Sequence, residues 1–263
     1  MKKLSIMTLT ILILGNLFSG VNSVSAQDKK LSFGVNVGYG IPGGDFSSTD
    51  ASKQPVVEYP STDTTHVSGY AKSGFHFNVY GDYMFASVIG GMISIGGNMN
   101  SYDVATLNSN VATAYTKAGF NGTLPAFTVS GSYYVGQYLI GPYVSIPAGS
   151  KLRIEIKALV GLTSVNYPTL SYSYSFFGSP ISETITVKSS SGFGYNFGAG
   201  IKYMVTDMVG LHFNVCYAGC SASYPSYTAT ASDGTNSSSQ THNTAMAMSL
   251  SEIQVTVGAS IDR

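Results

Sequence analysis

The stretch LSFGVNVGYGI, residues 31–41, alternates large apolar residues with small or polar ones at every position. Leu31 and Phe33 begin the apolar set, while Ser32 and Gly34 begin the other. Because successive side chains of a β-strand point to opposite faces, this pattern predicts a strand with one apolar face and one small, polar face. The same alternation recurs along the chain, so the apolar faces together must be shielded from water.

The first 26 residues differ from the rest of the chain. A charged start at Lys2 and Lys3 precedes an apolar stretch over 4–14, and small residues end the segment at Ala26. This order is typical of a secretory signal peptide that is cleaved off. The apolar stretch is shorter than the roughly 20 residues that a spanning helix needs, which disfavours a retained anchor. We therefore expect residues 1–26 to be a removed signal.

Composition narrows the class of the remaining segment, residues 27–263. It contains no second long apolar run, so any membrane-spanning part must consist of strands. Charged residues are only 10% of the chain, whereas soluble domains carry about 25%. The 13 basic residues less Lys2 and Lys3 leave 11 against 13 acidic ones, a formal charge of −2. With no basic run present, nucleic acid is excluded as an expected partner.

Eight runs of the chain carry the alternation. Short turns near residues 86, 149 and 206 separate some of them, which indicates antiparallel neighbours joined by tight connections. The predicted fold is all-β, an eight-stranded antiparallel up-and-down transmembrane β-barrel. Its expected strands are residues 31–41, 74–85, 88–100, 136–147, 151–165, 192–205, 208–219 and 250–261.

Four long segments alternate with the short turns. They are rich in Ser, Thr and Tyr, and we expect them to be extracellular loops, with the turns and both chain ends on the periplasmic side. Residues 127–135 alternate in the opposite parity from the strand that follows. We therefore expect either a bulge near Gly136 or a strand that extends above the membrane. The long segments lie at about 42–72, 101–124, 165–190 and 220–245.

The inward faces of the predicted strands collect charged and His side chains. Eight strands enclose an interior just wide enough for its own side chains, so an open channel is not expected. Charges in so narrow a space must be paired to offset their desolvation, and we interpret them as a structural polar core. A proton or ion path is the alternative. The cluster comprises His76, Asp82, Arg153, Glu155, Lys157, Lys202, His212 and Glu252.

Motifs for catalysis and metal binding are missing from the same sequence. It contains neither a GxSxG elbow nor an HExxH helix, so we expect no catalytic residue, metal or cofactor. Cys216 and Cys220 lie about 13 Å apart along a plain strand, which is beyond the usual disulfide span. A bridge between them would require a sharp bend at Gly219, and this alternative stays open.

The third long segment contains a group of aromatic side chains. Tyr supplies contact area at a small entropic cost, so this group is a candidate surface for an extracellular partner. The alternative is that these aromatic residues belong to two strands that extend beyond the membrane. The residues are Tyr172, Tyr174, Phe176 and Phe177.

With its signal, strand pattern and connection lengths, the chain resembles the small outer-membrane β-barrel domains of Gram-negative bacteria, the OmpA-like and porin-like group. This resemblance implies insertion by the barrel-assembly machinery, which reads a terminal strand with a polar residue, a Gly and spaced apolar residues ending in an aromatic. Thr256, Gly258 and Ile261 match that pattern, whereas Arg263 stands in place of the aromatic.

These observations favour a non-enzymatic, monomeric barrel in the cell outer membrane, in contact with its lipid. Its displayed loops would serve envelope integrity or surface interaction with an extracellular partner. One alternative is a lipid- or peptide-modifying barrel enzyme, which needs Ser, His and an acid converging near the rim. Another is a soluble lipocalin-like barrel that binds a small apolar ligand, which the outward apolar faces disfavour.

Overall fold

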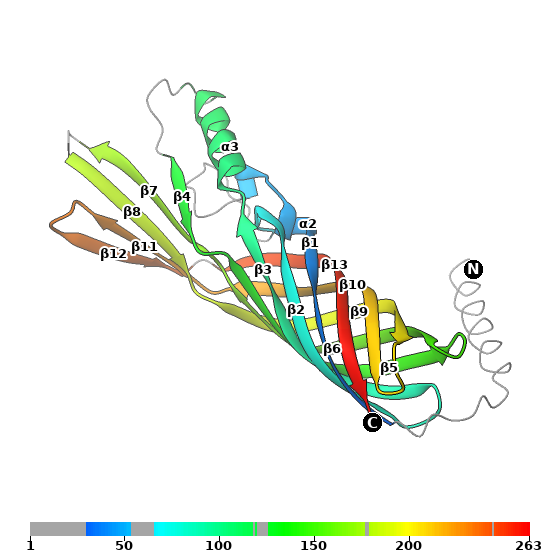
Figure 1. Cartoon of the computed structure of the whole chain (residues 1–263). Coiled ribbons are helices and arrows are strands. Elements are labelled where there is room, and N and C mark those ends of the chain that lie inside the picture. Colours follow the sequence, from blue (N-terminus) through cyan, green and yellow to red (C-terminus); the bar gives the residue numbers. More distant parts are fainter. Residues whose placement is uncertain (1–29, 54–65, 118, 120–125, 177–178, 244) are drawn as a thin grey trace, which may run out of the picture.

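The structure, a computed structural model, describes residues 30–53, 66–117, 119, 126–176, 179–243 and 245–263. Figure 1 shows a barrel that continues at one end into a second sheet flanked by a helix. Among the described residues, no helix is both long and apolar enough to cross a membrane. The predicted signal peptide lies outside the described residues.

Eight antiparallel strands close the barrel, as predicted. Each strand pairs with the next barrel strand along the chain, and the last pairs with the first, in the order β1-β13-β10-β9-β6-β5-β3-β2. The strands have 13 to 17 residues, and all but β6 are longer than the predicted runs. They are β1 (Leu31–Gly43), β2 (Ala71–Met84), β3 (Ile89–Tyr102), β5 (Tyr133–Pro147), β6 (Leu152–Asn166), β9 (Ser190–Met204), β10 (Val209–Tyr224) and β13 (Met246–Asp262).

The two faces of the barrel wall differ in the way that the alternation predicts. Phe33, Ile93 and Val257 are each 56% exposed on the outside, and they belong to a belt of exposed aliphatic and aromatic side chains that runs round the barrel. The intervening side chains, such as Asn36 and Ser94, are buried inside. An apolar belt of this extent is incompatible with water and compatible with lipid.

Tight turns join the strands at one end of the barrel, near residues 86, 149 and 206 as predicted. Both ends of the described barrel chain meet there. The backbone N–H of Leu31 donates to the Arg263 carbonyl (3.0 Å), and the N–H of Arg263 donates to the Leu31 carbonyl (2.7 Å). We call this the short-turn end.

No bulge occurs at Gly136. The register of β5 with β3 is unbroken from Tyr133 to Val144, and the odd-numbered side chains face inward throughout. The change of parity in the sequence has another cause: Tyr133 and Val135 are apolar because the interior itself becomes apolar at this end of the barrel. The chain instead breaks its strand at Gly131, which adopts a φ of +83° between β4 (Phe127–Ser130) and β5.

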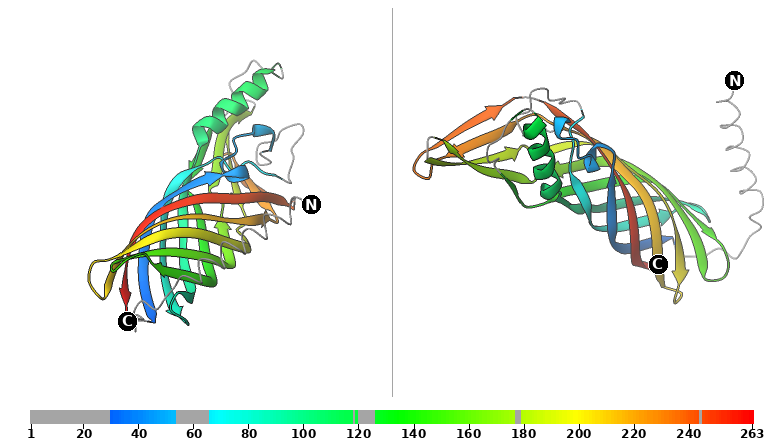
Figure 2. Two further views of the ribbon diagram at one scale, coloured as in Figure 1. Left: turned by 90° about the vertical axis from the view of Figure 1, so that its right-hand side faces the viewer. Right: turned by 90° about the horizontal axis from the view of Figure 1, so that it is seen from above.

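The described parts of the four long segments contain regular secondary structure that the sequence did not predict. The third and fourth segments form a second sheet together with β4, in the order β12-β11-β8-β7-β4, and the second segment contains a 14-residue helix (Figures 1 and 2). The described part of the first segment contains two short helical turns. We call the second sheet and these helices together the cap. Its elements besides β4 are α2 (Gly44–Ser47), η1 (Ala51–Lys53), α3 (Val104–Lys117), β7 (Thr169–Phe176), β8 (Ser179–Val187), β11 (Tyr227–Ser232) and β12 (Ser237–His242).

A core of apolar and aromatic side chains joins the cap to the barrel mouth. Tyr133 and Tyr224 from the barrel, Leu107 from α3 and Leu170 from β7 are all fully buried in it. The phenol of Tyr133 donates to the Gly69 carbonyl (2.7 Å), which ties β5 to the segment before β2. Because this core fills the mouth, the cap closes the barrel at the end opposite the tight turns.

Candidate functional site

The strand alternation places all eight residues of the predicted polar cluster toward the barrel interior. Arg153 and Lys157 are partly exposed. The other six side chains, His76, Asp82, Glu155, Lys202, His212 and Glu252, are 3–5% exposed. Side chains from several different strands therefore converge in one enclosed space.

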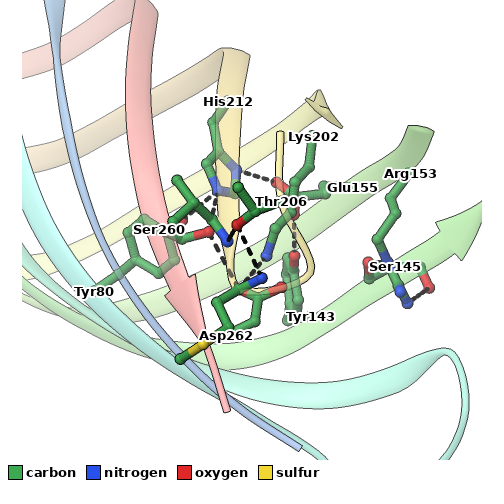
Figure 3. A network of polar contacts seen from close by, with 12 residues as sticks. Tyr80, Tyr143, Ser145, Arg153, Glu155, Lys202, Thr206, His212, Ser260 and Asp262 are labelled. Carbon is green, nitrogen blue, oxygen red and sulfur yellow. Dashed lines mark hydrogen bonds and ion pairs between the residues drawn. The ribbon is translucent and has the colours of Figure 1, made fainter. Parts of the chain in front are cut away.

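Near the short-turn end these side chains form a continuous network (Figure 3). His212 Nδ1 lies 2.9 Å from Glu155 Oε2, and Glu155 also accepts a hydrogen bond from the Tyr143 phenol. Lys202 Nζ donates to Asp262 Oδ1 (2.6 Å) in a buried ion pair. Glu155, Lys202 and Asp262 thus each have a partner of opposite sign or a hydrogen-bond donor, as a low-dielectric interior requires. The buried Oδ2 of Asp82, in contrast, accepts no hydrogen bond from a described residue.

A second network lies farther from the short-turn end, around Glu252. Its carboxylate accepts hydrogen bonds from the side-chain amides of Asn98, Asn100 (3.2 Å) and Gln254 (3.3 Å). His76 Nδ1 lies 2.5 Å from Asn98 Oδ1. Three neutral amides therefore stabilise this carboxylate in place of a cation.

The two partly exposed cations lie at the edges of the networks. Arg153 donates from Nε to the Ser145 hydroxyl (2.8 Å), and it lines a cavity of about 20 Å³ at the short-turn end together with Asp82. Lys157 lines a cavity of about 10 Å³ with Glu155 and His212. Cavities of this size hold a single water molecule and not a substrate.

Several members of these networks were not in the predicted cluster. Tyr80, Tyr143, Ser260 and Asp262 are neutral or terminal residues, and a prediction based on interior charges passes over them. Their inward parity was readable from the same alternation, which therefore carried enough information to find them. The alternation does not predict which inward side chains contact each other. Glu155 and His212, for example, lie on β6 and β10, with β9 between the two strands.

One contact set resembles a hydrolase constellation. His212 lies between Glu155 and Ser260, with Nε2 2.8 Å from the Ser260 hydroxyl. Yet that hydroxyl is within 3.2 Å of Asp262 Oδ1 and can donate to it instead, and Ser260 is 2% exposed. The arrangement has the distances of a nucleophile and its base, but the adjoining cavity of about 10 Å³ has no room for an acyl substrate.

Metal binding and disulfide formation need side chains that the site does not bring together. Within the described part of the chain, no group of three or more His, Cys, Asp or Glu side chains is placed to hold a metal ion. Cys216 and Cys220 are free and buried on the inward face of an extended β10, so the chain makes no bend at Gly219 that would join them.

The predicted aromatic group lies on the cap sheet. Tyr172 and Tyr174 stack on β7 with ring centroids 5.9 Å apart, and the Tyr172 phenol donates to Glu183 Oε2 (2.7 Å). Tyr174 is 37% exposed. Phe176 ends β7, and Phe177 lies outside the described residues. Tyr172, Tyr174 and Phe176 therefore lie on a strand outside the barrel, and their role as a contact surface stays a prediction.

No protein-family model matches the chain, and no curated protein sequence matches it. Solved structures with a similar fold include the attachment invasion locus protein Ail of Yersinia pestis (12% identity, TM-score 0.41, covering 89% of this chain and 99% of that one). Neisserial surface protein A (10%, 0.43, 89% and 97%) and a major outer membrane protein from Thermus thermophilus (14%, 0.45, 89% and 99%) are also similar.

At these identities and TM-scores, nothing about function passes from those proteins to this chain. The barrel itself supplies the conclusion about architecture. Its eight neighbouring antiparallel strands, polar interior and apolar outer belt are the features by which the sequence resembles the small Gram-negative outer-membrane β-barrels. The fold of this chain is therefore the fold of that group.

Proposed function

We propose that the chain is a non-enzymatic outer-membrane barrel that displays a folded cap outside the cell for envelope integrity or surface interaction. The observation that carries this proposal is the combination of an apolar belt with an interior that is filled by polar side chains and closed by the cap core. The belt supports insertion in lipid, and the filled interior argues against transport.

The strand lengths suit such a membrane. A strand of 13 residues rising about 3.3 Å each and tilted about 40° crosses more than the roughly 25 Å apolar band of an outer membrane. Insertion would follow export with the predicted signal and would use the barrel-assembly machinery. Thr256, Gly258 and Ile261 on β13 supply most of the terminal-strand pattern that the machinery reads.

Topology is tested with two single-cysteine variants in a C216S/C220S background. Ser239→Cys lies on cap strand β12, and Ser150→Cys lies in a short turn. In intact cells that express the full chain, a membrane-impermeant maleimide should label Cys at 239 and should label Cys at 150 only after the outer membrane is permeabilised. Equal labelling of both in intact cells, or their recovery in the soluble fraction, would contradict the proposal.

Transport is tested by conductance in planar lipid bilayers. Because the interior cavities measure about 10 to 20 Å³, the purified barrel should produce no steady open channel. A stable conductance that disappears when the interior is altered would overturn the non-transporting part of the proposal and favour an ion path.

A hydrolase is the second candidate, because of the contacts among Ser260, His212 and Glu155. A fluorophosphonate probe reacts with a serine that is activated and accessible. We expect no labelling of the folded barrel, since Ser260 is buried and can donate its hydrogen to Asp262. Labelling that is lost in Ser260→Ala and retained in the exposed-serine variant Ser150→Ala would establish an enzyme instead.

A further inference from the structure

The cap sheet has two edges, and they differ in how their backbone groups are satisfied. At β4, a four-residue edge strand, α3 covers the backbone: the Asn108 side chain accepts from the Phe127 N–H (2.7 Å) and donates to the Phe127 carbonyl (3.0 Å). At the other edge, five of the six residues of β12 are exposed, and the sixth, His242, is partly exposed. The β4 edge is thus bonded to α3 at Phe127, whereas the β12 edge is exposed along its length.

The open edge has none of the usual protections against strand pairing. Exposed edges are normally blunted by Lys or other charges, by Pro, by bulges or by being very short. The sequence of β12 is SSSQTH, with no Pro and no Asp, Glu, Lys or Arg, and its register with β11 is unbroken from Ser237 to His242. This edge therefore presents a regular row of backbone donors and acceptors to an incoming strand.

Hydroxyl side chains form rows that cross the sheet and end at this edge. Neighbours within the rows bond to one another: Ser171 to Thr184 (3.2 Å), Thr230 to Ser239 (2.9 Å) and Thr228 to Thr241 (3.1 Å). Such cross-strand hydroxyl pairs stabilise a sheet. The longest row, given by the strand registers, is Thr128, Ser171, Thr184, Thr230 and Ser239.

The edge is complementary to itself. In an antiparallel pair of two β12 strands centred on Ser239, Ser239 faces Ser239 of the second copy and Ser237 faces Thr241 of the second copy. On the face of Ser237, Ser239 and Thr241 each hydroxyl then meets a hydroxyl, as it does on this face across the β11–β12 pair, and two uncharged edges do not repel each other. We propose that the β12 edge pairs with the β12 edge of a second copy of this chain, joining the two cap sheets into one.

Such a pair fixes where the two barrels lie. Figures 1 and 2 show the cap sheet extending away from the barrel, with the β11–β12 turn at its far end. Antiparallel pairing reverses one sheet relative to the other, so the barrels lie at opposite ends of the joined sheet and in two facing membranes. This deepens the proposed surface interaction and rests on it, and it differs from the monomer expected from the sequence.

The test uses the chain from Gln27 to Arg263 reconstituted in phosphatidylcholine vesicles. Vesicles that carry the protein should cluster, measured by light scattering. Ser239→Lys should reduce clustering to the level of protein-free vesicles, because two ammonium groups would face each other across the edge. Ser173→Lys adds the same charge on the same sheet face, on interior strand β7, and should cluster like the unaltered protein.

A cross-link adds a direct measurement of register. In a C216S/C220S background, Ser239→Cys should give a disulfide-linked dimer under mild oxidation of clustered vesicles, and Ser173→Cys should not. Clustering that survives Ser239→Lys, absence of both clustering and dimer, or capture of an unrelated extended peptide at β12 without clustering would each overturn the self-pairing. Failure of the barrel to insert, seen as loss of heat-modifiable gel mobility, would instead count against the proposed function.

Discussion

Inside the barrel, individual side chains are held by partners that lie on other strands. Glu155 contacts His212 and Tyr143, and Lys202 contacts Asp262, with every one of these groups buried. A buried charge without its partner is strongly destabilising, whereas a complete pair is close to neutral. The interior residues therefore contribute to stability as sets.

Glu155→Gln should lower the free energy of unfolding by roughly 1–3 kcal/mol, because it weakens the buried hydrogen bonds that the carboxylate makes with Tyr143 and His212. Urea unfolding in detergent, followed by heat-modifiable gel mobility, measures this. Glu183→Gln on the cap sheet is the matched control and should change the value by less than about 1 kcal/mol, since its partner Tyr172 is only partly buried. Unchanged stability with increased conductance for Glu155→Gln would contradict the structural role.

Burial raises the pKa of Tyr70, in the cap core, to about 12. The neutral phenol, which donates to the Thr49 carbonyl (2.8 Å), is thus favoured in the folded cap. Its contribution to cap stability should be complete below the unfolded pKa of about 10 and should be lost as the pH rises toward 12.

Tyr70→Phe should reduce the pH dependence of cap stability by the share that Tyr70 contributes, although it lowers stability at pH 8 by about 1 kcal/mol through loss of the hydrogen bond. Near-ultraviolet circular dichroism of the clustered tyrosines, recorded during thermal unfolding at pH values from about 8 to about 12, follows the change. An identical slope in the variant would mean that Tyr70 does not carry the effect.

The direction of each side chain was predictable from the sequence, and its partner was not. Period-two alternation assigns parity locally, so it placed Glu155 and His212 inside. Their contact depends on how far the strands are staggered around the barrel, which no local pattern records.

Among the elements that the sequence did not predict, α3 is the longest. Its buried residues are Leu107 and Val111, a single i, i+4 pair, so its hydrophobic periodicity is weak. Its start does carry a signal: the Asp103 carboxylate accepts from the backbone N–H (3.2 Å) and the hydroxyl (2.9 Å) of Thr106.

Asp103→Ala should destabilise α3 by about 1 kcal/mol, because the Thr106 N–H would lose the carboxylate that accepts its hydrogen bond at the start of the helix. Hydrogen exchange of the α3 amides should accelerate accordingly, while the barrel amides stay unchanged. Asp103→Asn keeps an acceptor at the same position and should behave nearly like the original. If the alanine variant exchanged its α3 amides at the original rate, the Asp103 side chain would contribute little to the stability of the helix.

The cap strands have the alternating sequence pattern of β-strands, although they lie in segments whose composition is typical of loops. In β7, TLSYSYSF alternates Thr and Ser with Leu and aromatic residues, which is the same period of two that identified the barrel. The small hydroxyl residues are also typical of loops, so composition favours a loop where the period of two indicates a strand. Packing of Leu170 and Ile185 into the cap core supplies the long-range contacts that hold the segment in a sheet.

At the scale of the whole molecule, the chain has an apolar belt between two polar regions of different construction. The short-turn end has only tight connections and the ends of the described barrel chain, whereas the other end has a folded cap with its own core. Connection lengths alone predicted that the short turns lie at one end of the barrel and the long segments at the other, since tight hairpins need only a few residues. The secondary structure of the long connections was not predictable in the same way, because it depends on contacts in the cap core among segments that are distant in the sequence.

Folding in lipid-like surroundings tests the central claim most directly. The chain from Gln27 to Arg263 is refolded with and without detergent micelles, and circular dichroism is compared with gel mobility of unheated and heated samples. Because the belt exposes side chains such as Phe33 and Val257, a β-rich, heat-modifiable species should form only with detergent. A β-rich monomer that forms and stays soluble without detergent would contradict the membrane barrel.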